Sequence, residues 1–215
     1  MTIRELYSLE HTLAKPWLEK FTYPWAALEG LSKWLQQLGA TLEGYQEILP
    51  GVWVHPDADI ADSAVLAAPC IIGPGSELRP RAYIRGSVLV GSGCVVGNST
   101  ELKNAILFDG VQAPHFNYVG DSILGYKAHL GAGVICSNVR GDREQVSVGG
   151  IPTGRKKVGA MIGDLAEVGC NTVLNPGTVI GKRARIYPIS SVRGLVPEDA
   201  IHKNDGTIVK INAEK

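Results

Sequence analysis

The sequence predicts a mainly β protein, a parallel β-helix, and three observations support this fold class. Large aliphatic residues recur every six positions, a small or β-branched residue stands two positions before most of them, and Gly often follows them. A helix would give a period near 3.6 and an ordinary strand a period of two. A period of six is typical of a β-helix, in which each hexad forms one strand and one turn and three hexads close a coil.

The aliphatic residues of this ladder, called rungs below, point into the coil, and the pattern resembles the left-handed triangular prism, an exception to right-handed crossovers. The regular rungs are Val54, Ile60, Leu66, Ile72, Leu78, Ile84, Val90, Val96 and Leu102. With two hexads shortened to five residues, the next rungs are Leu107, Ala113, Val119, Leu124, Leu130 and Cys136. The last rungs are Ile162, Val168, Leu174, Ile180, Ile186 and Val192.

The segments outside the ladder follow other patterns. Residues 1–50 carry apolar residues at helical spacing, which predicts two amphipathic helices, one ended near Pro16 and one from Pro24 to Gly39. We expect them to form an N-terminal helical cap, because an open β-helix end exposes unpaired backbone. Residues 51–197 would form the β-helix, with an inserted loop at 139–161 rich in turn formers and cations, and residues 198–215 a polar C-terminal tail.

Composition limits the class of partner. The chain has 21 basic and 21 acidic residues, which argues against attraction to nucleic acid or a membrane surface by net charge. No apolar run is long enough for a membrane span, and the N-terminal residues lack the form of a signal peptide. The four cysteines show no metal-type spacing, and Cys70 and Cys94 fall on inward positions, so we expect reduced core thiols. A cytoplasmic location follows as an expectation.

Two cations are predicted to stack on one edge of the prism. Arg85 and Lys103 each follow a rung and are eighteen residues apart, which is one full coil. Like charges this close are unfavourable without a negative group nearby. A phosphate would satisfy both; neutralisation by Glu101 or Glu77 is an equally weighted alternative.

One histidine is predicted to face outward near these cations. His115 lies two residues past a rung, while Glu101 and Tyr118 each stand just before a rung on successive coils. A neutral imidazole beside a carboxylate that fixes its tautomer is a candidate general base. The alternative is an ordinary surface histidine.

At these positions the chain resembles a known family. The runs Gly97-Asn-Ser-Thr-Glu-Leu-Lys103, Pro114-His-Phe-Asn-Tyr-Val-Gly-Asp121 and Leu130-Gly-Ala-Gly133 are similar to the C-terminal acetyltransferase domain of bifunctional N-acetylglucosamine-1-phosphate uridylyltransferase / glucosamine-1-phosphate acetyltransferase. The resemblance implies a left-handed β-helix, a homotrimer with sites between subunits, and N-acetylation of an amino-sugar 1-phosphate by acetyl-CoA, with no metal.

The same resemblance implies a role for each matching residue. Those implied for catalysis are His115 as the general base, the carboxylate Glu101, and Asn138. Those implied for binding the sugar phosphate are Arg85, Lys103, Tyr118, His129 and the loop residue Lys157. Those implied for coenzyme A are the backbone N–H of Ala132, facing the thioester oxygen, then Cys170 and Lys203.

The chain also departs from the family. The uridylyltransferase domain is missing, and Val139, His129 and Cys170 replace a tyrosine, an asparagine and a serine of the family's site. Two alternatives to the acetyltransferase therefore remain: a non-catalytic or regulatory subunit that binds sugar phosphates or nucleotide sugars, and a zinc carbonic-anhydrase-like trimer. The zinc alternative needs three imidazoles, and only His115 and His129 lie well within the coils.

Overall fold

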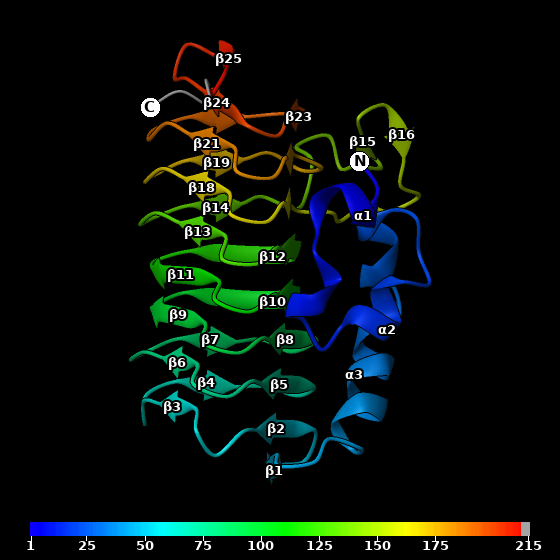
Figure 1. Cartoon of the computed structure of the whole chain (residues 1–215), viewed down its shortest axis with the longest axis vertical. Helices are drawn as coiled ribbons and strands as arrows, with labels where there is room; N and C mark the ends of the chain where they lie inside the picture. The colour runs from blue at the N-terminus through cyan, green and yellow to red at the C-terminus, as the bar shows by residue number, and fades with distance from the viewer. Residues whose placement is uncertain (212–215) are drawn as a thin grey trace.

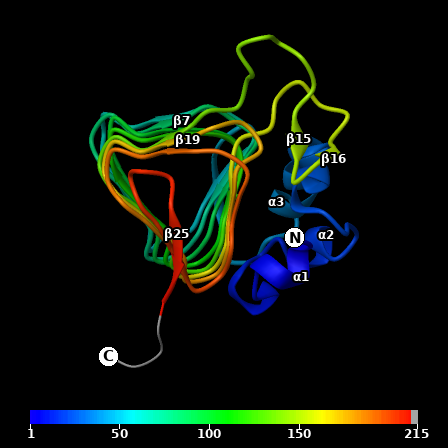
Figure 2. The same ribbon diagram turned by 90° about the horizontal axis from the view of Figure 1, so that it is seen from above.

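The computed structural model describes residues 1–211 as a triangular β-prism with helices along one side (Figure 1). Seen from above, the coils pass from the wall of β7 and β19 to the wall beside the helices and then to the third wall (Figure 2). This path is clockwise as the chain rises toward the viewer, so the β-helix is left-handed, as the sequence predicted. Within the described residues, every helix is too short or too polar to cross a lipid bilayer.

Each wall of the prism is a stack of parallel strands. The first wall, beside the helices, contains β2 (Val52–Val54), β5 (Cys70–Ile72), β8 (Val88–Val90), the later halves of β10 (Glu101–Leu107) and β12 (Tyr118–Leu124), β17 (Met161–Ile162), β20 (Val179–Ile180) and β23 (Leu195–Val196). The second wall contains β4 (Val65–Leu66), β7 (Tyr83–Ile84), the first halves of β10 and β12, β14 (Ile135–Cys136), β19 (Val173–Leu174) and β22 (Ser191–Val192). The third wall contains β3 (Asp59–Ile60), β6 (Glu77–Leu78), β9 (Val95–Asn98), β11 (Gln112–His115), β13 (His129–Leu130), β18 (Glu167–Val168), β21 (Arg185–Ile186) and β24 (Ala200–His202).

The strand register confirms the predicted rungs. Ile84 pairs with Leu102 eighteen residues later, and Leu102 pairs with Val119 only seventeen residues later, because of a five-residue hexad. Across the insertion the offset grows: Leu124 pairs with Ile162. The shortened hexads and the interruption therefore leave the stacking of inward residues intact.

The Gly residues after rungs are required by crowding between coils. A Cβ on Gly73 would lie 2.5 Å from the Gly91 carbonyl oxygen of the next coil. The hydroxyl group of a small inward residue can find a hydrogen-bond acceptor in the coil above: Ser76 Oγ donates to the Gly91 carbonyl at 2.6 Å. A polar atom can thus be buried in the prism without the cost of a missing hydrogen bond.

The helices lie along the first wall and do not cover an open end of the prism, so the predicted cap has a different place (Figure 1). The outward residues of this wall from β5 to β20 are apolar and fully buried: Ile71, Leu89, Ile106, Ile123, Met161 and Val179. The first predicted helix is divided into α1 (Ile3–Leu6) and the 3-10 helix η1 (Leu9–His11), and the second into the 3-10 helix η2 (Pro24–Leu28) and α3 (Leu31–Gly39). Near Pro16, where the first helix was expected to end, a further short helix begins, α2 (Lys15–Leu18), with Pro16 in its first turn. An apolar wall needs a partner layer, which explains this placement.

Antiparallel strands cover the backbone at the two ends of the prism. β1 (Gln46–Leu49) pairs with β2 at the first coil, and β25 (Ile208–Lys210) pairs with β24 at the last. The predicted tail from residue 198 is therefore ordered as far as residue 211: β24 is a further rung strand, in which His202 pairs with Ile186. The sequence prediction missed it because the hexad between Val192 and Val196 is shortened to four residues and a histidine occupies the inward position. The end of the predicted tail, residues 212–215, lies outside the described residues.

The insertion folds back onto its own chain. It leaves the prism after Asn138, forms the hairpin of β15 (Ser147–Val148) and β16 (Ile151–Pro152), and returns where Val158 N donates to Asn138 O at 3.0 Å. Val146 and Val148 are buried, and Arg155 forms an ion pair with Glu29 of the helical segment at 3.5 Å. Figures 1 and 2 show the hairpin near the N-terminus and α1.

Candidate functional site

The predicted cation pair lies at the edge between the first and second walls. Ile84 and Leu102 are paired, so the residues that follow them, Arg85 and Lys103, occupy equivalent positions on adjacent coils. Each has a carboxylate partner: Arg85 Nη1 donates to Glu101 Oε1 at 2.8 Å, and Lys103 Nζ lies 3.5 Å from Asp121 Oδ2. Glu101 therefore neutralises Arg85, which is one of the alternatives that the sequence left open. Asp121 neutralises Lys103 in the same way.

These ion pairs leave donors free for a ligand. Arg85 has five N–H donors, and only Nη1 is engaged within residues 1–211. Its side chain is 48% exposed, and the hydrogen bond to Glu101 raises the pKa of the guanidinium. Lys103 is 25% exposed and also retains ammonium protons. The carboxylates fix the two cations in place, and both can still reach an anion on the surface.

Asp121 is the centre of this cluster, and the sequence analysis assigned it no role. Its side chain is buried, and it accepts from Asn104 Nδ2 at 2.7 Å, from Asn138 Nδ2 at 2.5 Å and from the Lys103 ammonium. It thereby joins two predicted site residues from separate coils. One feature of the sequence pointed to Asp121: it ends the run from Pro114 to Asp121 that resembles the family.

Tyr118 and Glu101 lie side by side on the second wall, where their backbones pair. A Cβ on Gly120 would lie 2.5 Å from the Tyr118 hydroxyl and 2.9 Å from Asn138 Nδ2, so these two groups converge over a glycine. Burial, then Glu101 and Asp121, raises the pKa of the Tyr118 phenol. The phenol therefore remains protonated and can donate a hydrogen bond.

His115 lies at the other edge of the second wall and is exposed. It pairs with Asn98 of the coil below, and five residues of chain, less than about 17 Å, separate Asn98 from Lys103. A carboxylate beside the imidazole remains a prediction: among residues 1–211 the hydrogen-bond partner of Glu101 is Arg85. His115 and the cations thus face the second wall from opposite edges.

The backbone N–H of Ala132 lies one coil above His115. Gly133 N donates to His115 O at 3.0 Å, which fixes this stacking. Among the described residues no acceptor faces the Ala132 N–H, and the equivalent Cys170 N–H, one coil further, is also free. Cys170 itself is exposed, whereas Cys70, Cys94 and Cys136 are buried free thiols.

The remaining predicted residues lie apart from this cluster. His129 is on the third wall, where Nδ1 lies 2.8 Å from Glu167 Oε2. Lys203 follows the last rung strand, and the register places it three coils above Gly131, about 14 Å away. Lys157 forms a backbone bridge with Val139, next to Asn138, at the root of the insertion.

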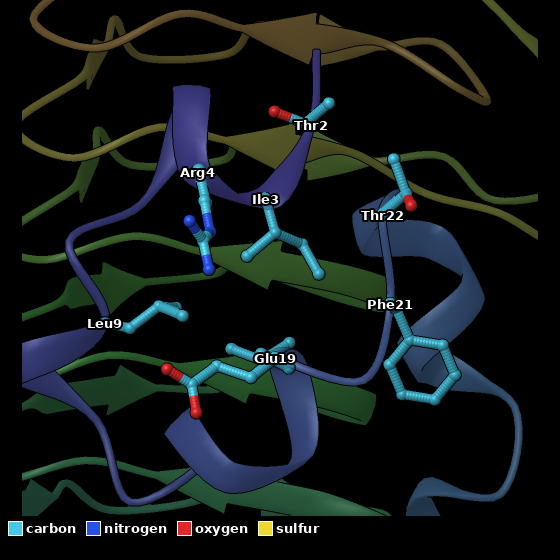
Figure 3. A pocket seen from close by; sticks show the side chains of 8 residues that line it. Thr2, Ile3, Arg4, Leu9, Glu19, Phe21 and Thr22 are labelled. Atoms are coloured by element: carbon cyan, nitrogen blue, oxygen red, sulfur yellow. The ribbon is translucent and has the colours of Figure 1, made fainter.

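A pocket of about 240 Å³ opens elsewhere, within the helical segment (Figure 3). Apolar side chains of Ile3, Leu9 and Phe21 share its lining with Arg4 and Glu19. None of the predicted site residues lines it. Within residues 1–211, no three His, Cys, Asp or Glu side chains are grouped closely enough to hold a metal ion.

By its fold the chain is a left-handed parallel β-helix of hexapeptide repeats. A family model described as the GMPPB C-terminal domain matches residues 66–150. A bifunctional sugar-1-phosphate nucleotidylyltransferase/acetyltransferase of Sulfurisphaera tokodaii is 40% identical over 90 residues, which are 40% of this chain and 22% of that protein. The bifunctional protein GlmU of Methanococcus maripaludis is 33% identical over 111 residues, or 50% of this chain and 27% of that protein.

The chain therefore resembles these bifunctional enzymes, as the sequence motifs indicated, and it spans about a quarter of their length. Among solved structures, perosamine N-acetyltransferase of Caulobacter crescentus with CoA and GDP-perosamine has a TM-score of 0.38 and 18% identity, covering 73% of this chain and 55% of that one. The UDP-N-acetylglucosamine acyltransferase of Francisella novicida has a TM-score of 0.42 and 18% identity, covering 70% and 64%.

Proposed function

We propose that this protein is an acetyl-CoA-dependent N-acetyltransferase that acts on an amino-sugar 1-phosphate. The observation that supports this most is the second wall, which has two cations at one edge and an exposed imidazole at the other. The names of the sequence relatives, which join sugar-1-phosphate chemistry to acetyl transfer, agree with it. The ligand would lie across the wall, over Glu101 and Tyr118.

In this proposal Arg85, Lys103 and the Tyr118 hydroxyl hold the phosphate by charge-assisted hydrogen bonds. His115 accepts a proton from the sugar amine as the amine nitrogen attacks the thioester carbonyl carbon. A C–N bond forms, the C–S bond breaks, and the coenzyme A thiolate leaves and takes up a proton. The Ala132 N–H stabilises the oxyanion of the intermediate, and Asn138 orients the sugar.

Coenzyme A would run along the edge that carries Ala132 and Cys170, with its phosphates near Lys203. Ala132 and Cys170 lie on successive coils of this edge and Lys203 lies two coils above Cys170, so an extended molecule can follow them. His129 and Lys157 are proposed as further substrate contacts. His129 lies on the third wall, beside Glu167.

A homotrimer is part of the proposal. The second wall exposes apolar side chains beside the site: Val65 is 57% exposed, Tyr83 39% and Val173 38%. A second copy packed over this wall would bury them and close the groove over Glu101 and Tyr118. A closed groove would exclude water and strengthen each charged contact.

The direct test is thiol release from acetyl-CoA with glucosamine 1-phosphate as the acceptor. We expect turnover by the wild type, a fall of roughly 10²-fold or more in kcat for His115→Ala, and a raised KM for Arg85→Gln. His55→Gln, far from the groove, is the matched control and should keep wild-type rates. Absence of thiol release together with absence of sugar-phosphate binding would exclude the proposal.

A non-catalytic sugar-phosphate-binding role is the second candidate. The pairing of Glu101 with Arg85 favours it, because the carboxylate does not orient His115. This role predicts sugar-phosphate binding without turnover, and equal binding by the wild type and His115→Ala.

A further inference from the structure

A polar hollow of about 320 Å³ lies at the root of the insertion. One side is formed by the edge of the prism through Ser137, Asn175 and Arg193, and the other by the first residues of the insertion, Val139 to Asp142. Polar and charged side chains dominate this hollow, which is unlike a core cavity.

The three prism residues belong to the same vertical column as Arg85 and Lys103. The rungs Val119, Cys136, Leu174 and Val192 are paired in succession, so the residues that follow the last three stack directly on one another. Ser137 lies two strand spacings above Lys103, about 10 Å, and Arg193 lies four spacings above it, about 19 Å. A single phosphate cannot bridge Lys103 and Arg193, so the hollow is distinct from the site proposed above.

The hollow contains a cation that no carboxylate neutralises. Arg193 Nη2 donates to Asn175 Oδ1 at 3.3 Å, and in the part of the chain that the structure describes its guanidinium has no ion pair. Asn175 is fixed with its oxygen toward Arg193, because its Nδ2 donates to Val192 O at 2.9 Å. Arg193 therefore keeps its full charge and several oriented N–H donors.

The other charges of the hollow nearly cancel. Arg140 donates two hydrogen bonds to Asp142, at 2.9 and 2.5 Å, and this pair lowers the pKa of the Asp142 carboxyl. Asp142 Oδ1 also accepts from Glu144 N at 3.1 Å. A carboxylate bound in this way is a weak competitor for Arg193, which leaves the hollow with one unit of positive charge.

Two more groups add to its preference for an anion. The Ser137 hydroxyl has no hydrogen-bond partner among residues 1–211 and can donate into the hollow. Lys157 is bridged to Val139, a lining residue, and the side chains of paired residues project to the same side of a ladder. Lys157 is therefore placed beside Val139, next to the hollow, and its ammonium would add a second positive charge.

We propose that this hollow is a second anion site, which binds a phosphate group through Arg193, Ser137 and Lys157. A phosphate offers several acceptor oxygens that match the planar N–H donors of an arginine. The phosphate group belongs to a free phosphate anion or to coenzyme A; the second case requires coenzyme A to follow this edge instead of the edge of Ala132 and Cys170. The site does not use the cation pair of Arg85 and Lys103; Lys157 is the residue that it shares with the contacts of the proposed function, so Arg193→Gln is the variant that separates the two.

The test is calorimetric titration of the full chain at low ionic strength, where exposed charges are least screened. The probes are inorganic phosphate, coenzyme A and dephospho-coenzyme A, which lacks the 3′-phosphate. The variants are Arg193→Gln, Lys157→Gln and Arg85→Gln. Arg185→Gln, an exposed arginine on the third wall, is the matched control.

We expect Arg193→Gln to weaken binding of one probe roughly tenfold, Lys157→Gln to weaken it less, and Arg185→Gln to leave it unchanged. A loss for inorganic phosphate identifies a free-anion site, and a loss for coenzyme A with none for dephospho-coenzyme A identifies the 3′-phosphate. Equal affinities of the wild type and Arg193→Gln for all three probes overturn the proposal. Loss of glucosamine 1-phosphate binding in Arg85→Gln but not in Arg193→Gln tests the proposed function separately.

Discussion

Replacing Asp121 with alanine is expected to destabilise the fold and to weaken acceptor binding together. The carboxylate is buried and accepts from Asn104 and Asn138 while it pairs with Lys103. Its removal leaves two amide donors without an acceptor and a largely enclosed ammonium without a counter-charge. Because those groups lie on the coils below and above Asp121, the loss affects how the coils are held as well as the site.

The magnitude follows from these contacts. A buried donor left without a partner costs about 1–3 kcal/mol, and a broken buried ion pair costs about 3–5 kcal/mol. Lys103 is 25% exposed and water replaces part of the loss, so we expect about 2–4 kcal/mol in total for Asp121→Ala. Asp121→Asn keeps the shape and one acceptor and should cost about 1–2 kcal/mol.

Two measurements check this prediction. Denaturant titration gives the free energy of unfolding, and for a chain of this size the alanine variant should also melt about 5–15 °C lower. Acceptor kinetics should give a KM raised roughly tenfold with a smaller change in kcat, since His115 is untouched. Asp142→Asn, which alters an exposed pair with Arg140, is the control and should melt close to the wild type.

Either of two results would refute the reasoning. An Asp121→Ala variant as stable as the wild type would mean that Asp121 does not hold the three coils together. A variant that loses stability while KM stays unchanged would mean that Asp121 supports the fold but does not position Lys103 or Asn138. Partial recovery of KM in Asp121→Asn would separate geometry from charge.

Two further predictions concern the prism itself. Burial raises the pKa of three core thiols to about 12, those of Cys70, Cys94 and Cys136. In the unfolded chain a thiol ionises above its ordinary pKa of 9.0, whereas in the native protein these thiols stay protonated. The free energy of unfolding should therefore fall as pH rises from 9 toward 12, by on the order of 1 kcal/mol per thiol at pH 10. Equal unfolding midpoints at pH 8 and 10 would contradict this. Gly97→Ala should cost about 3 kcal/mol or more, because its Cβ would lie 1.4 Å from Pro114 O, whereas Gly141→Ala, with nothing within 4 Å, should unfold like the wild type.

The coil could be predicted because its signal is local and repeated. Every hexad that places an aliphatic residue inward supports the same register, so single exceptions such as His202 do not disturb it. The same sequence also contained an overlooked pattern: on every third hexad the residue before the rung is apolar, as at Ile71, Leu89 and Ile106. This pattern marks a wall that needs a covering layer, and it explains why the helices lie along the side of the prism.

The site was predicted in position but only partly in its contacts. Arg85 and Lys103 are eighteen residues apart, which is one full coil. Because the coil length is fixed, this spacing predicted that the two residues stack on one edge of the prism. Spacing does not determine which carboxylate a flexible side chain reaches, so it left the bond from Arg85 to Glu101 as one of two alternatives and missed the role of Asp121.

The sequence by itself determined the coil, its rungs and the edge on which each charged residue lies, since these follow from a period that repeats along the chain. Only the tertiary structure decided where the helices pack, how the insertion returns beside Asn138 and which ion pairs form. Those features depend on contacts between residues far apart in the chain, such as Arg155 with Glu29, and no local period encodes such contacts.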